Sequence, residues 1–241
     1  MPKVSVIVPA LNEEGYIDDL LRDLAAQTRP AAEVIVVDAG SSDGTVEAVE
    51  NSPVGARLVH GSRPVANGRN LGAGQAQGDL LVFLDADVRL ERDFLQRFVE
   101  EIERRGLDLA CPHYTSGDSS RAARELFWAI SALLRLFERV LPSGAGACIA
   151  VRREVFETSR GFDPEMKFED VEFVRRLARG RRFGITDQAV RVSDRRFLQE
   201  GEARTALRYS LLTLLFALGR FRWANLMDYE FGRYGEGRAG R

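Results

Sequence analysis

The chain has 241 residues, 45% hydrophobic and 29% charged, which is enough to bury a substantial core in one large α/β domain or two small ones; we expect one. Its formal net charge of -2 at pH 7 argues against bulk electrostatic attraction to nucleic acid. Cys111 and Cys148 are too few for a disulfide framework and lack zinc-site spacing, so we expect buried free thiols in a reducing compartment.

Apolar strands and helical patterns alternate along the first half of the chain. In chain order, the expected elements are strand Val4–Val8 ended by Pro9, helix Tyr16–Ala26, strand Glu33–Asp38, helix Thr45–Glu50, strand Ala56–His60, helix Asn67–Gln77 and strand Asp79–Leu84. A further helix is expected to start near Glu91. Continuously apolar strands separated by helices indicate a parallel sheet covered on both faces. The sequence therefore predicts a doubly wound α/β unit.

Three of these strands end on polar or turn-forming residues, namely Pro9–Glu14, Asp38–Thr45 and Asp85–Asp87. In open α/β sheets, ligands bind at the carboxyl ends of the strands. We therefore expect the three segments to gather at one edge and line a ligand crevice. Helix capping is the alternative explanation for Asp43 and Asp87, because each precedes an expected helix.

The stretch LLVFLDADVRL ends a buried strand on two carboxylates, Asp85 and Asp87. Carboxylates are hard oxygen ligands for Mg²⁺ or Mn²⁺, and such an ion takes its remaining ligands from water and substrate phosphates. The spacing therefore predicts a cation site that accepts a diphosphate.

Five segments resemble the inverting family 2 glycosyltransferases in the expected order. They are VSVIVPALNEEGYI, VIVVDAGSSDGT, ANGRNLGAGQAQGD with the following LDAD, GAGACIAVRREVFETSRGFDP, and KFEDVEFVRRL, which together span about residues 3 to 180. The resemblance implies a GT-A fold, with a mostly parallel central sheet flanked by helices and a helical C-terminal extension. It also implies a GT-A domain over 1–198, with a nucleotide-binding half at 1–90 and an acceptor-side half at 91–198, and an amphipathic helical extension over 199–241.

The resemblance also implies a nucleotide-sugar donor linked to UDP or GDP, and Mn²⁺ or Mg²⁺ as cofactor. Asp38 would accept hydrogen bonds from the base, Arg69 would pair with phosphate oxygens, and Asp87 would hold the cation, with Asp85 on the ribose or the cation. The residues that the resemblance assigns to the nucleotide sugar are Pro9, Ala10, Leu11, Asn12, Glu13, Asp38, Arg69, Asp85, Ala86 and Asp87.

Transfer with inversion needs a carboxylate that takes the proton of the acceptor hydroxyl. In KFEDVEFVRRLARG, helical spacing places Glu169 and Asp170 in a first turn, where the helix N-terminus stabilises them whether or not they are catalytic. The resemblance selects Asp170 as the base and Glu169 as its neighbour. The residues alone do not exclude a retaining mechanism with a second carboxylate nucleophile.

Parts of the sequence also resemble features of three other functional classes. The glycines Gly72, Gly74 and Gly78 have the wrong spacing for a dinucleotide fingerprint and lead into a strand, so close helix packing explains them better. A sugar-phosphate nucleotidyltransferase would need positive charge after the first strand, where this chain has PALNEEG. A non-catalytic nucleotide-sugar-binding protein stays open.

The acceptor depends on the second half of the chain. Arg121–Leu141 is expected to form an amphipathic helix packed on the sheet. Arg195 and Arg196 would contact either the donor diphosphate or an acidic acceptor, with solvated surface charge as the alternative. The C-terminal segment has an apolar stretch between arginines that is too short to span a bilayer, so it would lie on the inner face of the cell membrane or form a core or homodimer helix. We expect a cytoplasmic protein whose acceptor is a polyprenyl phosphate or a saccharide.

Overall fold

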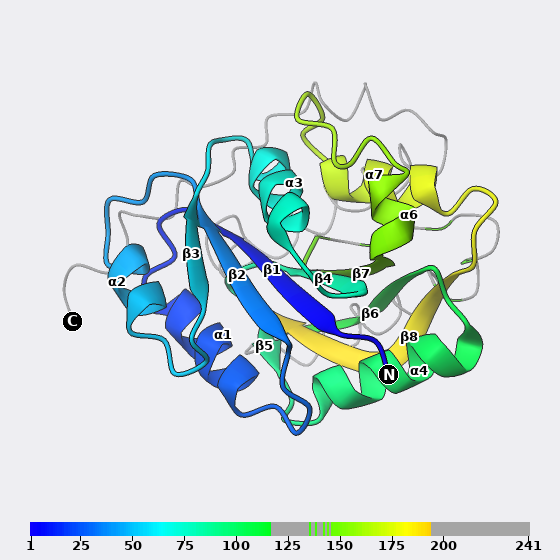
Figure 1. Cartoon of the computed structure of the whole chain (residues 1–241), viewed down its shortest axis with the longest axis horizontal. Coiled ribbons are helices and arrows are strands. Elements are labelled where there is room, and N and C mark those ends of the chain that lie inside the picture. Colours follow the sequence, from blue (N-terminus) through cyan, green and yellow to red (C-terminus); the bar gives the residue numbers. More distant parts are fainter. Residues whose placement is uncertain (117–134, 136–137, 139–141, 143, 145, 194–241) are drawn as a thin grey trace.

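A computed structural model describes residues 1–116, 135, 138, 142, 144 and 146–193 (Figure 1). In chain order the elements are β1 (Val4–Ala10), α1 (Tyr16–Ala25), β2 (Glu33–Asp38), α2 (Thr45–Glu50), β3 (Arg57–His60), α3 (Val65–Gln75), β4 (Leu80–Leu84), β5 (Arg89–Leu90), α4 (Phe94–Arg105), β6 (Leu109–Ser116), β7 (Cys148–Arg152), α6 (Arg153–Glu157), α7 (Glu169–Leu177) and β8 (Phe183–Val192).

One mixed sheet runs through the described part of the chain in the order β3-β2-β1-β4-β7-β6-β8-β5. The four strands of the first half pair in parallel, β1 with both β2 and β4, and β2 with β3. Strand β7 joins β4 in the antiparallel direction, and β6 and β8 are parallel to each other. The expected parallel α/β unit is therefore present, and β7 connects it to the second half.

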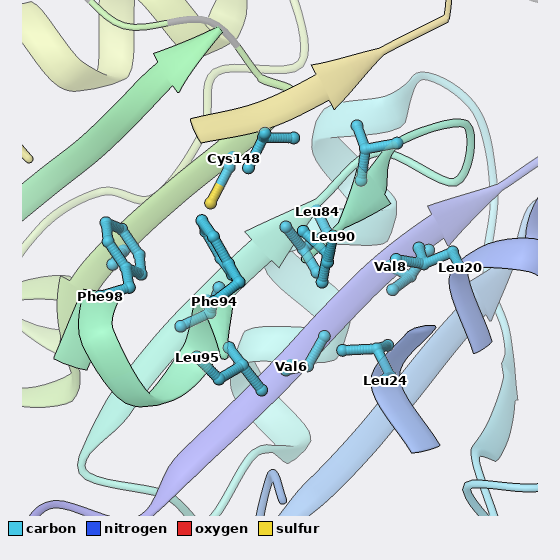
Figure 2. Packing of buried hydrophobic residues seen from close by; sticks show 14 of the residues in the cluster. Val6, Val8, Leu20, Leu24, Leu84, Leu90, Phe94, Leu95, Phe98 and Cys148 are labelled. Atoms are coloured by element: carbon cyan, nitrogen blue, oxygen red, sulfur yellow. The ribbon is translucent and has the colours of Figure 1, made fainter. Parts of the chain in front are cut away.

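Two hydrophobic clusters cover the two faces of the sheet. The first lies under α1, α2 and α4, and Figure 2 shows Val6 and Val8 of β1 meeting Leu20 and Leu24 of α1. The second cluster lies under α3, α6 and α7, which Figure 1 shows above the strands in that view. Because both faces are buried, the central strands β1, β2, β4 and β7 carry nearly continuous apolar runs and not alternating ones.

The predicted elements of the first half are confirmed with small shifts at their ends. Strand β1 does not stop before Pro9, because Pro9 pairs with Val37 after the pairing with β4 has ended at Ile7 and Phe83. At Pro9 the strand is paired on one side only, where a residue without an N–H group is tolerated. Helix α3 begins two residues earlier than expected, and α4 begins at Phe94 and not near Glu91.

Small residues let α3 pack closely on the sheet. A Cβ atom on Gly72 would lie 2.5 Å from Cγ2 of Ile7, and one on Gly68 would lie 3.3 Å from Cβ of Pro9. At Gly74, by contrast, a Cβ atom would meet nothing within 4 Å. The predicted close helix packing is therefore confirmed for Gly72 and wrong for Gly74. Gly78 lies after α3, and a Cβ atom there would lie 2.6 Å from Oγ of Ser5.

Several predictions concern residues outside the described part. The helix expected over Arg121–Leu141 falls almost entirely there, and the C-terminal extension over 199–241 falls wholly there. Within the described residues, the structure contains no helix that is both long and apolar enough to cross a membrane. Cys111 and Cys148 are buried and free, as predicted.

Candidate active site

The carboxyl ends of β1, β2 and β4 open into three segments that carry most of the predicted donor-side residues. Parallel pairing places Ala10 beside Asp38, and Ile7 beside Phe83 near the end of β4. The polar ends of these strands therefore meet at one edge of the sheet, as the sequence predicted.

Hydrogen bonds join the segment after β1 to the segment after β2. The Asn12 amide N–H donates to Oγ of Ser41 at 2.9 Å, and Oδ1 of Asn12 accepts from the Ser42 amide at 2.9 Å. Asn12 adopts a φ of 54°, a left-handed conformation that Asn tolerates better than most residues. The Glu13 amide donates to Oγ1 of Thr45 at 2.8 Å. The two segments therefore form one preorganised wall.

Asp38 ends β2 with its side chain almost fully buried. Its carboxylate accepts hydrogen bonds from the Gly40 amide at 3.0 Å and from both the amide and the hydroxyl of Ser41. These bonds fix the turn that follows β2. The hydrogen bond from a nucleotide base to Asp38 stays a prediction.

Asp43 has a local structural role. Its carboxylate accepts from the Glu14 amide at 3.1 Å and from both the amide and hydroxyl of Thr45, the first residue of α2. Partial burial works to raise its pKa, but the hydrogen bonds from Thr45 and Glu14 outweigh that effect and lower the pKa below the ordinary value. This geometry supports capping and turn formation at Asp43.

Asp85 and Asp87 follow β4 directly. The side chain of Asp85 is 38% exposed, and its Oδ1 accepts from Nη2 of Arg69 at 2.7 Å. Ala86 between them is buried, whereas Asp87 is partly exposed. Because α4 begins only at Phe94, Asp87 lies too far from that helix to cap it, and the capping alternative is wrong for this residue.

Arg69 lies on α3 between the two groups of carboxylates. Its side chain is only 3% exposed, and it forms ion pairs with Asp85 through Nη2 and with Glu169 through Nη1. Its guanidinium carbon lies 5.4 Å from the ring centroid of Phe162. The predicted contact with phosphate oxygens stays a prediction, but the structure shows that this arginine also bridges the β4 exit and α7.

Glu169 and Asp170 occupy the first turn of α7, as predicted. Oδ2 of Asp170 accepts from the Gly146 amide at 2.5 Å, and Oδ1 accepts from the Val171 amide at 2.8 Å. Burial raises the pKa of both carboxyl groups, although the charge of Arg69 opposes the rise. Among the described residues each oxygen of Asp170 accepts one hydrogen bond, and a carboxylate oxygen has two lone pairs.

Two residues near the site were missed in the sequence. Gly146 touches both Arg69 and Asp170, and a Cβ atom there would lie 2.4 Å from Nη2 of Arg69. Asn70 forms two hydrogen bonds to the backbone of Phe162. Gly146 lies in GAGACIAVRREVF and Asn70 in ANGRNLGAG, two segments that carry the family resemblance. Their place in these motifs was the sequence signal that could have marked them as site residues.

A metal ion would need ligands beyond the side chains of the described residues. Among the described residues, no group of three or more His, Cys, Asp or Glu side chains is arranged to hold one. Asp85 and Asp87 supply hard oxygen atoms one residue apart, which fits a Mg²⁺ or Mn²⁺ ion that draws its other ligands from a diphosphate and water. Arg195 and Arg196 lie outside the described residues.

Comparison with known proteins gives a matching family model and related chains. The model of glycosyl transferase family 2 matches residues 5–160. The glycosyltransferase AglE of Haloferax volcanii is 37% identical over 119 residues, which cover 45% of this chain and 38% of AglE. The matched segment therefore spans less than half of that curated relative.

Solved structures agree with this result. The mannosyltransferase PcManGT from Pyrobaculum calidifontis, in complex with GDP-Man and Mn²⁺, has a TM-score of 0.63 and 29% identity, and the match covers 77% of this chain and 55% of that one. Glucosyl-3-phosphoglycerate synthase from Mycobacterium tuberculosis has a TM-score of 0.61 and 24% identity, covering 90% of this chain and 79% of that one. These likenesses show that the chain has the GT-A fold.

Proposed function

The chain belongs to glycosyl transferase family 2, and from this membership we propose that it transfers a sugar from a nucleoside-diphosphate sugar to an acceptor with inversion at the anomeric carbon. The relatives named as glycosyltransferases support the reaction class.

One observation carries the proposal: a single buried arginine, Arg69, holds Asp85 at the exit of β4 and Glu169 at the start of α7. A metal-dependent inverting transfer uses carboxylates that hold the cation on the leaving-group side and a carboxylate base on the acceptor side. Asp85 with Asp87, and Glu169 with Asp170, supply these two groups. The ion pairs of Arg69 with Asp85 and Glu169 support the proposal that both groups act at one site.

The donor binds at the carboxyl edge of β1, β2 and β4. The interlocked segments from Pro9 to Glu13 and from Asp38 to Thr45 form the nucleoside wall, and their mutual hydrogen bonds preorganise it. Asp38 contributes a buried carboxylate at the base of this wall. The relative solved with GDP-Man and Mn²⁺ supports a nucleotide-sugar donor and a divalent cation.

Asp87, assisted by Asp85, holds the divalent cation. When bound, the cation neutralises the charge that develops on the departing diphosphate. The partial exposure of both aspartates leaves their carboxylates accessible to a ligand.

Asp170 takes the proton of the acceptor. The bond between the anomeric carbon and the diphosphate oxygen breaks, the acceptor oxygen forms the new bond from the opposite side, and the acceptor proton passes to the Asp170 carboxylate. The hydrogen bond from Gly146 orients that carboxylate. A pKa raised by burial makes it a stronger base than an exposed aspartate.

The acceptor is a hydroxyl or phosphate compound, and a polyprenyl phosphate at the membrane surface and a saccharide are the two classes to compare. Arg195 and Arg196 are proposed to contact either this acceptor or the donor diphosphate. The experiment for these residues is transfer to each acceptor class with the full chain and with Arg195→Ala/Arg196→Ala.

Calorimetry with UDP and GDP, each with Mn²⁺ and then with EDTA, tests the donor site directly. Metal-dependent binding of one nucleotide is expected, and the other nucleotide serves as its control. The nucleotide that binds then selects the sugar donors for transfer assays. Absence of binding for both nucleotides would contradict the proposed function.

A further inference from the structure

We propose that Asn70 is a positioning residue which, through Phe162, sets the location of the α7 carboxylates relative to Asp85. The inference rests on the proposed function for its catalytic consequence. Its structural part concerns how α3 and α7 are held together. No role was assigned to Asn70 from the sequence.

Asn70 clamps a distant turn by two hydrogen bonds. Its Nδ2 donates to the Phe162 carbonyl at 2.8 Å, and its Oδ1 accepts from the Phe162 amide at 2.8 Å. Two bonds to the same residue fix orientation as well as distance. Gly161 has a φ of 69°, and a Cβ atom there would lie 2.5 Å from Oδ1 of Asn70. Glycine is therefore required both by the turn and by the close approach of Asn70.

The ring of Phe162 touches the three elements that carry the site. It is 1% exposed and stacks on Phe173 of α7 with a centroid distance of 3.9 Å. It meets Phe83 of β4 edge-on at 5.0 Å, and the Arg69 guanidinium of α3 lies 5.4 Å from its centroid. A shift of Phe162 would therefore move α7, and with it Asp170, relative to Asp85 and Arg69.

The same turn is also attached to α7. Nη2 of Arg176 donates to the Gly161 carbonyl at 2.5 Å, and Nε of Arg176 pairs with Glu172 at 2.8 Å. Removal of the Asn70 side chain would break the two hydrogen bonds between Asn70 and Phe162 that hold the turn to α3. The turn would stay attached to α7 through Arg176. The expected result is a displacement of α7 relative to α3, with the fold of each half retained.

The test compares Asn70→Ala with Asn67→Ala. Asn67 lies on the same helix, and its side-chain amide donates to the Arg63 carbonyl at 2.8 Å and to Ser62, within its own segment. Hydrogen exchange over residues 161–173, thermal unfolding, nucleotide binding and transfer kinetics are measured for both variants. Asn70→Asp is the second variant, since it can still accept from the Phe162 amide but cannot donate to its carbonyl.

In Asn70→Ala, exchange at the Phe162 amide should rise by roughly fivefold or more, as for one lost hydrogen bond. The kcat for transfer should fall roughly 10- to 100-fold, because catalysis is sensitive to displacements near 1 Å. The KM for the donor and the Kd for nucleotide should stay within about twofold of the wild-type values, since misplaced acceptor-side groups affect the chemical step and not donor binding. Asn67→Ala should leave all of these quantities at wild-type values.

Asn70→Asp, which keeps the acceptor for the Phe162 amide, should show a smaller rise in exchange than Asn70→Ala. Unchanged exchange at the Phe162 amide in Asn70→Ala would overturn the inference. So would a wild-type kcat, or a loss of nucleotide binding as large as the loss of kcat. If the wild-type protein transfers no sugar, the proposed function fails, whereas the exchange data still decide whether Asn70 holds α7 in place.

Discussion

Replacement of Gly146 by alanine would add a single atom, Cβ, beside Arg69 and Asp170 in the candidate site. The Gly146 amide donates to Oδ2 of Asp170 at 2.5 Å, and its carbonyl lies 3.5 Å from Nη2 of Arg69. The new Cβ atom would lie 2.4 Å from Nη2 of Arg69 and 3.0 Å from Oδ2 of Asp170. Both overlaps fall on groups that the proposed reaction uses.

The size of the overlap gives the expected effect. An ordinary carbon contact begins near 3.4 Å, so the guanidinium or the Gly146 backbone must move by about 1 Å. A displacement of that size costs on the order of 100-fold in rate. Overpacking of a buried position also lowers the free energy of unfolding by about 1–3 kcal/mol. Arg69 would then lose either the 2.7 Å bond to Asp85 or its place over Phe162.

The assay measures kcat for transfer, nucleotide binding with Mn²⁺, and chemical unfolding of Gly146→Ala. Gly74→Ala is the matched control, because Gly74 is exposed on α3 and its added Cβ would meet nothing within 4 Å. That control should gain up to about 1 kcal/mol in stability with unchanged activity. A Gly146→Ala protein with wild-type kcat would refute the assignment of Gly146 to the site.

Three further predictions follow from the site. Asp87→Ala should abolish metal-dependent nucleotide binding in calorimetry. Its control is Asp93→Ala, which removes an exposed acid at the N-terminal side of α4 and should leave nucleotide binding unchanged. Equal nucleotide binding by the two variants would exclude Asp87 as a metal ligand. Asp170→Asn should bind nucleotide as the wild type does and lose transfer by roughly 100-fold or more, and an active variant would contradict the base assignment. Because hydrogen bonds lower the pKa of Asp43 in the folded state, the stability it contributes is present above pH 3.8 and is lost as the pH falls through the lower folded-state pKa. Urea unfolding at pH 6 and pH 3 should therefore show a smaller acid loss in Asp43→Asn than in the wild type, and an equal loss would contradict this role.

The first half of the fold followed from local signals. Continuous apolar runs, such as Val34–Val37 and Leu80–Leu84, predicted buried parallel strands, and helical spacing predicted α1 closely. These signals are short-range, because strand and helix periodicity is written into neighbouring residues. The ends of elements were less predictable. Strand β1 continues through Pro9 because its pairing with β2 extends to Ala10, whereas its pairing with β4 ends at Ile7.

The candidate site was predictable in its carboxylates but not in its connections. Asp38 ends β2, Asp85 and Asp87 follow β4, and the carboxyl ends of parallel strands meet at one edge of a sheet. The first-turn position of Asp170 followed from helical spacing. By contrast, nothing local indicates that Arg69 forms ion pairs with both Asp85 and Glu169, its partner 100 residues away in sequence.

The sequence by itself determined the strands and helices of the first half, the polar ends of those strands and the family to which the chain belongs. Only the tertiary structure decided that Arg69 forms ion pairs with Asp85 and Glu169 and that Asn70 forms hydrogen bonds with Phe162. It also decided that Gly146 has no room for a side chain. The physical reason is that periodicity and turn chemistry act between near neighbours. Ion pairs and close approaches depend on where separate elements pack, and that position is set by the whole core.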